Sequence, residues 1–134
     1  MSYQTSAGVY QQAQVATADR GRLLILMFDG ALRFLAQAEN GLRNDRLEEF
    51  ASQLGRAQAV IAELLHTLDH KAGGEIAAQL ERLYRFMLDH LVEANVQKSV
   101  RHVEQVRRVL SIIAEAYREV VAQGPAVLGA RNAA

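Results

Sequence analysis

The chain contains no cysteine and only one proline, Pro125, among its 134 residues. Without cysteine there can be no disulfide and no thiolate-bound metal. Because no proline precedes position 125, proline interrupts no helix over residues 1–124. The chain also has no net charge, since 15 basic residues balance 15 acidic ones. Composition therefore provides no electrostatic attraction to nucleic acid or to an anionic membrane.

Two further absences concern targeting. Residues 1–14 have neither a basic segment nor an apolar stretch of the kind found in secretory signals. No apolar run approaches the roughly 20 residues that a membrane-spanning helix requires, so we expect no membrane insertion. The lack of cysteine suits a cytosolic protein. Half of the residues are apolar, which is enough for the core of a single domain.

Apolar periodicity predicts four helices, at about 20–42, 46–69, 75–95 and 99–122. Asp19 is the expected N-cap of the first helix, and Gly124 with Pro125 ends the last. The connections are short and the lengths similar, so neighbouring helices should pack antiparallel. We therefore expect an all-α fold, an antiparallel up-down-up-down four-helix bundle over 17–123. Residues 1–16 are expected to form a flexible N-terminal capping segment, and 124–134 a disordered tail.

Two of these helices carry more apolar residues than a bundle interior needs. One stripe of the first predicted helix suits a core: Leu24, Phe28, Ala31, Leu35, Ala38 and Leu42. Leu23, Leu26 and Met27 point elsewhere, with Leu26 almost opposite the stripe. The third helix is similarly wide, with Leu83, Tyr84, Phe86, Met87, Leu88, Leu91 and Val92, and Ile112 lies off the seam of the fourth. Such surplus predicts an interaction surface, covered by the N-terminal segment, by a second subunit or by a partner.

The sequence gives little support for metal binding or catalysis. A di-iron bundle needs two Glu-x-x-His pairs and two further glutamates, but only Glu63 and His66 have this spacing. His66 and His70 are four residues apart on one predicted helix and could bind zinc, although no third ligand is evident. We find no nucleophile motif and expect no catalytic residue and no cofactor. A metal-binding bundle and a homo-oligomeric structural bundle remain as alternatives.

Several motifs occur in an order that resembles one known family. They are Tyr10 with Val15-x-Thr17-Ala18, Leu24-x-x-Met27-Phe28-Asp29-Gly30, Gly73-Gly74-Glu75-Ile76-Ala77, Leu83-Tyr84-x-Phe86-Met87 and Leu91-x-x-Ala94-Asn95. Together they resemble the flagellin-specific export chaperones of the FliS family over residues 8–121. One difference is that the family usually has Ser-Pro-Gly-Glu where this chain has Asp19-Arg20-Gly21-Arg22. Arg22 cannot close the capping box that glutamate would form, although Asp19 retains an N-cap.

The resemblance implies a cytoplasmic helical bundle without enzymatic activity. It implies that the C-terminal segment of flagellin, disordered when free, folds as helices against apolar grooves of the chaperone. This binding would prevent premature polymerisation and deliver flagellin to the flagellar type III export apparatus, whose export-gate components are further implied partners. The residues to which we assign client-binding or capping roles are Tyr10, Val15, Leu23, Leu26, Met27, Tyr84, Met87 and Asn95. For Asn95, a helix C-cap is the competing interpretation.

Overall fold

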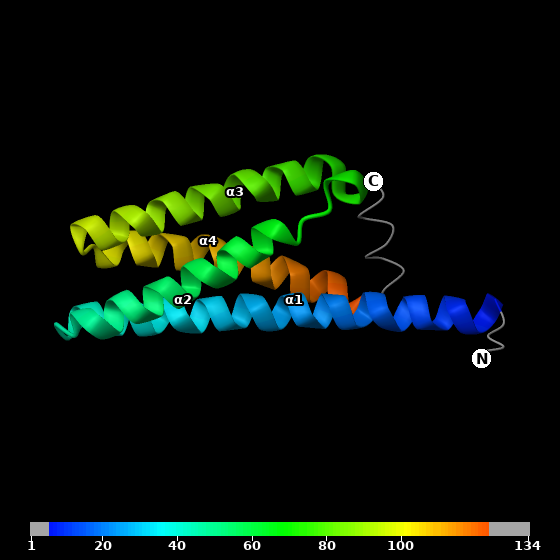
Figure 1. The fold of residues 1–134 in the computed structure, drawn as a ribbon, viewed down its shortest axis with the longest axis horizontal. Helices are drawn as coiled ribbons and strands as arrows, with labels where there is room; N and C mark the ends of the chain where they lie inside the picture. The colour runs from blue at the N-terminus through cyan, green and yellow to red at the C-terminus, as the bar shows by residue number, and fades with distance from the viewer. Residues whose placement is uncertain (1–5, 124–134) are drawn as a thin grey trace.

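A computed structural model describes the backbone of residues 6–123 and the side chains of residues 19–123. Four helices are present: α1 (Ser6–Arg43), α2 (Leu47–His66), α3 (His70–Gln97) and α4 (Val100–Ala122) (Figure 1). Each helix contacts the helices before and after it, and α4 closes the ring against α1. The predicted all-α up-down bundle is confirmed. Over the described residues, no helix combines the length and apolarity needed to cross a membrane.

The core follows the predicted stripes. On α1, the four central positions of the expected stripe are fully buried: Phe28, Ala31, Leu35 and Ala38. On α2, the buried residues are Phe50, Leu54, Ala57, Ile61 and Leu64, and on α4 they are Val103, Val106, Leu110 and Ala114. These sets repeat at spacings of three or four residues. Each helix therefore directs one apolar stripe toward the centre of the bundle.

The expected start of the first helix was wrong. α1 begins at Ser6 rather than near Arg20, and Asp19 lies inside it instead of capping it. The physical reason is the absence of proline at position 20, because Arg20 keeps the backbone N–H that a continuing helix uses. Glutamine and alanine, which favour helix, are frequent before it. The first turns of α1 therefore extend past the other helices in Figure 1.

The second connection also differs from the prediction. α2 ends at His66, and α3 begins at His70 with Asp69 as its N-cap, whose carboxylate accepts from the backbone N–H groups of Lys71 and Ala72. The first turn of α3 is then offset at Gly74, which has φ 51° and ψ −125°. This conformation is essentially restricted to glycine. Residues 71–74, which the sequence places between the second and third predicted helices, therefore form a helical turn followed by a kink. Ser99 caps α4, as its hydroxyl accepts from the N–H of His102.

Gly41 lets α1 and α2 approach closely beside the first turn. A Cβ atom at this position would lie 3.0 Å from the backbone nitrogen of Phe50 and 3.2 Å from the carbonyl oxygen of Arg46. Since both neighbours are backbone atoms, a side chain here can fit only if the turn moves.

We therefore expect Gly41→Ala to lower the free energy of unfolding by about 1–3 kcal/mol, the usual cost of overpacking. Gly55→Ala is the matched control, because Gly55 has nothing within 4 Å of the added Cβ and alanine favours helix. Urea unfolding of both variants measures the difference. Equal stability of the two variants would contradict the close approach at Gly41.

Ion pairs close the seam between α1 and α4. Glu39, which is 5% exposed, accepts two hydrogen bonds from the Arg107 guanidinium, one of them 3.1 Å from Nη2 to Oε1. Toward the two ends of this seam, Asp29 pairs with Arg118 and Arg43 pairs with Glu104. Bidentate pairing fixes the relative orientation of both groups, so these contacts set the register of α1 against α4. Two arginines of α4, Arg107 and Arg118, thus pair with acidic residues of α1. The hydrogen bond to Glu39 raises the pKa of Arg107.

Candidate functional site

Exposed apolar side chains gather where α3 and α4 run side by side. His90 Nε2 lies 2.6 Å from Gln105 Oε1, which fixes the antiparallel register of the two helices. In that register Phe86 is level with Val109, and Leu83 is level with Ile112. We call these four residues the α3–α4 surface. Phe86 is 47% exposed and Ile112 67%, whereas Val109 packs partly against the core.

A column of rings bounds the α3–α4 surface at one end. The His90 ring stacks on Phe86 at 5.0 Å and on His102 at 4.3 Å between ring centroids. Nδ1 of His102 lies 2.7 Å from the Ser99 hydroxyl. The stacking of His90 on His102 and the contact of His90 with Gln105 hold α3 against α4 beside the apolar patch. Side chains with such defined partners present a preorganised surface rather than a mobile one.

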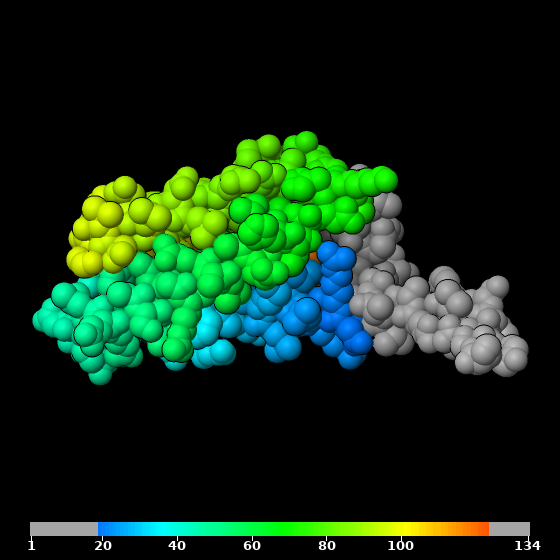
Figure 2. All heavy atoms as spheres, in the orientation of Figure 1, coloured from blue at the N-terminus to red at the C-terminus, as the bar shows by residue number. Residues whose placement is uncertain are grey.

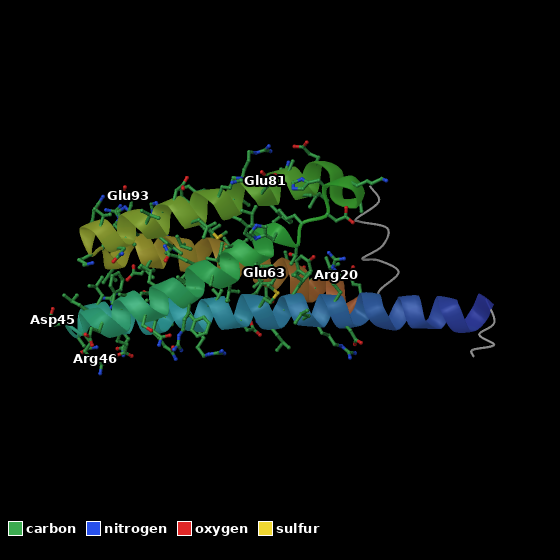
Figure 3. The ribbon with its side chains drawn as sticks, in the orientation of Figure 1. Arg20, Asp45, Arg46, Glu63, Glu81 and Glu93 are labelled. Carbon is green, nitrogen blue, oxygen red and sulfur yellow. The ribbon has the colours of Figure 1, made fainter. Side chains whose placement is uncertain are left out.

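The opposite end of the bundle holds a pocket of about 580 Å³. Its walls come from all four helices and from the connection between α2 and α3, and include Leu24, Phe28, Leu64, Ile76, Leu80, Tyr84 and Tyr117. Arg20, labelled in Figure 3, is one of its lining residues and donates a 3.1 Å hydrogen bond to the carbonyl of Thr67. Burial raises the pKa of both tyrosine hydroxyls, so they stay neutral at physiological pH. The pocket can therefore accommodate apolar side chains.

The structure separates the residues that the sequence assigned to client binding or capping. Leu23 and Leu26 are exposed on α1, and Met27 is partly buried beside them. Tyr84 and Met87 lie in the core, where Tyr84 borders the pocket. The side chains of Tyr10 and Val15 are outside the described residues. The assigned residues whose side chains the structure describes therefore lie in several locations and not in a single cluster.

Two interpretations of single residues need correction. Asn95 is not the C-cap of α3, because the helix continues to Gln97 and Lys98 takes the left-handed cap conformation with φ 52°. Asn95 is instead exposed and accepts a hydrogen bond from the Lys98 amine at 2.9 Å. His66 and His70 do not share a helix, because the break after α2 separates them. Nε2 of His70 lies 3.2 Å from Glu81 Oε1, and the described residues contain no cluster of three potential metal ligands.

Sequence reasoning identified Phe86 and Ile112 as surplus apolar residues but did not join them into one site. Val109 was missed altogether, since it resembles an ordinary seam residue in the sequence. The signal that would have found it is the register between α3 and α4, which periodicity alone does not give.

The sequence is similar to known proteins over most of its length. The model of the family described as "Flagellar protein FliS" matches residues 1–124. The chain is 37% identical to the flagellar secretion chaperone FliSB of Pseudomonas aeruginosa, covering 75% of this chain and 83% of the relative. It is 33% identical to FliS of Campylobacter jejuni, with 83% and 87% covered. For FliS of Salmonella typhimurium the identity is 32%, with 87% and 91% covered. This chain folds as a four-helix bundle with exposed apolar surface, and the family model matches nearly its whole length. The chain therefore belongs to the FliS family of flagellar proteins.

Proposed function

We propose that this flagellar secretion chaperone binds the disordered C-terminal segment of flagellin on the α3–α4 surface. The observation that supports this most directly is the exposure of Phe86 and Ile112 on adjacent helices. An amphipathic client helix can cover such side chains with its own apolar residues at positions i, i+4 and i+7. The chaperone would act in the cytoplasm, prevent premature polymerisation, and release the client at the export gate. It acts by binding and not as an enzyme.

Sequestration of this kind has a built-in limit on affinity. A disordered client loses conformational freedom when it folds on the chaperone, which consumes part of the gross interaction energy. The complex can therefore bury a large apolar area and still dissociate when the export apparatus takes the client. Leu23, Leu26 and Met27 lie on α1, away from the α3–α4 surface, and we propose that they belong to a separate interaction surface that does not hold the C-terminal segment of flagellin.

Titration calorimetry with flagellin tests the proposed function. We expect one-to-one binding to intact flagellin and no measurable binding when the C-terminal segment of flagellin is deleted. Circular dichroism should also show that an isolated C-terminal flagellin peptide gains helix on mixing with the chaperone. Heat of equal size with truncated flagellin would place the client element elsewhere, and no heat with either form would refute flagellin binding.

We also propose that residues 1–16 cap apolar surface when no client is bound. In the described conformation α1 continues straight past the bundle, so capping requires this helix to bend near Arg20 (Figure 1). The pocket at that end, which Arg20 borders, is the nearest surface to cover.

Deleting residues 1–16 should then increase binding of a dye such as ANS, with the thermal midpoint of the bundle nearly unchanged. The fold should persist because every fully buried side chain among the described residues lies at or after Phe28. Dye fluorescence and a thermal melt measure the two effects separately. An intact midpoint without extra dye binding would contradict the capping role.

A further inference from the structure

A second apolar surface runs along the outer side of the α1–α2 pair, which Figure 2 shows lying against each other. On α1, Leu23, Met27, Gly30 and Phe34 recur at spacings of four, three and four. On α2, Val60 packs partly against the core and Arg56 places its guanidinium 6.0 Å from the centroid of the Phe34 ring. We call this the α1–α2 surface.

The centre of the α1–α2 surface is open. A Cβ atom added to Gly30 would have only the Arg33 guanidinium near it, at 3.9 Å. The contact between Arg56 and Phe34 fixes the register of the two helices and places Gly30 level with Val60. The backbone of α1 is therefore accessible at this point, and another polypeptide can approach it closely.

Charges of opposite sign stand on either side of that centre. Arg33 and Arg56 flank the Phe34 ring, at 5.5 and 6.0 Å from its centroid. Glu63, labelled in Figure 3, lies two turns further along α2, at the level of Met27. No ion pair or hydrogen bond to another side chain occupies these three groups within the described part of the chain. The two ends are about 10 Å apart along the helix axis.

This arrangement is self-complementary. A two-fold axis at the level of Gly30 and Val60 would bring α2 against α2 of another copy in antiparallel orientation. Arg56 of each copy would then face Glu63 of the other, because the two residues lie at similar distances on either side of residues 59 and 60. Met27 would likewise face Phe34 of the other copy. A two-fold interface needs this pairing of a patch with itself.

The two terminal segments of the chain do not match the charges of the α1–α2 surface. Residues 1–18 contain no charged side chain, and residues 124–134 contain only Arg131. No side chain in either segment can supply a carboxylate to Arg33 and Arg56. Charge complementarity therefore favours a second copy over either end of the same chain as the occupant.

We infer that two copies of this protein associate through the α1–α2 surface, with two reciprocal Arg56–Glu63 ion pairs across a two-fold axis beside Gly30. The apolar strip is about 16 Å long on α1, so the interface is at the small end of the known range. We expect a dimer that dissociates in the micromolar range. The inference does not depend on flagellin binding, which we place on the opposite α3–α4 surface.

Charge reversal in analytical ultracentrifugation tests this directly. Arg56→Glu and Glu63→Arg each create two like-charge contacts, so each full-length variant should dimerise at least about tenfold more weakly than the wild type. The double variant Arg56→Glu/Glu63→Arg exchanges the charges and should restore the dimer. An equimolar mixture of the two single variants should form a heterodimer, since one chain then carries two acids and the other two bases.

Arg108→Glu is the matched control, because Arg108 is exposed on α4 and belongs to neither surface. It should leave dimerisation unchanged, and thermal melts should show that all variants remain folded. A wild-type protein that stays monomeric at several hundred micromolar would overturn the inference. So would a dimer indifferent to both single changes, or a double variant as weak as the single ones. Flagellin titrations of Arg56→Glu should match the wild type, so a failure of either proposal is recognisable.

Discussion

Replacing Phe86 with aspartate is expected to abolish flagellin binding while the bundle remains folded. Phe86 is 47% exposed and is the aromatic residue of the α3–α4 surface, level with Val109. A central aromatic contact is typically worth 2 kcal/mol or more in an interface, and a carboxylate buried without a partner adds a desolvation cost. Together these effects predict a dissociation constant at least about 100-fold higher. Titration calorimetry with intact flagellin measures it.

Leu47→Asp is the control for this experiment. Leu47 is similarly exposed, but it begins α2 and lies away from the α3–α4 surface. An acid in the first turn of a helix is favourable, so this variant should fold normally and bind flagellin as the wild type does. If Phe86→Asp binds with unchanged affinity, the client lies on another surface. If both variants lose binding equally, the effect is a general one of added charge.

The largest effect on stability is expected for Phe50→Ala. The Phe50 ring is fully buried, and its centroid lies 5.6 Å from the Lys98 amine. The backbone of Phe50 also lies close to Gly41. Truncating a buried phenylalanine usually costs 3–5 kcal/mol, because the transfer free energy is lost and a cavity remains. This is a large part of the roughly 5–15 kcal/mol that stabilises a typical domain.

We expect the thermal midpoint of Phe50→Ala to fall by about 10–20 °C. Leu47→Ala, one turn earlier on the exposed side of α2, should change it by no more than a few degrees. Thermal and urea unfolding followed by circular dichroism would show the difference. A cost below about 1 kcal/mol at Phe50 would mean that the neighbouring helices collapse into the space, and that the turn at Gly41 is less constrained than its geometry indicates.

Periodicity was sufficient to predict the bundle because each helix repeats one apolar stripe. Residues such as Phe28, Leu54 and Leu110 recur at spacings of three and four, and a helix must bury such a stripe. The boundaries were harder to predict. The Asp19 side chain could cap a helix, but the residues before and after it also favour helix. The helix therefore continues through Asp19 and does not begin there. The helical turn before Gly74 also depends on one backbone conformation that composition does not specify.

The candidate sites depend on relations between helices that no single segment encodes. Phe86 and Val109 become neighbours only through the register that His90 and Gln105 fix. The same limit explains why Asp29, which lies in an apolar run, could not be assigned to Arg118 from the sequence. These residues are 89 positions apart and pair across the seam between the first and last helices.

That seam has a consequence for the synthesis of the protein. Because α1 packs against both α2 and α4, its buried stripe lacks part of its packing until α4 has left the ribosome. A nascent chain ending before Val100 would expose the carboxylate of Glu39 and the apolar side chains around it. Native closure of the bundle therefore joins the first and last helices, which are far apart in the sequence, and must wait for α4. The time that a new chaperone molecule needs to become competent is set by its last helix, even though α1 is made first.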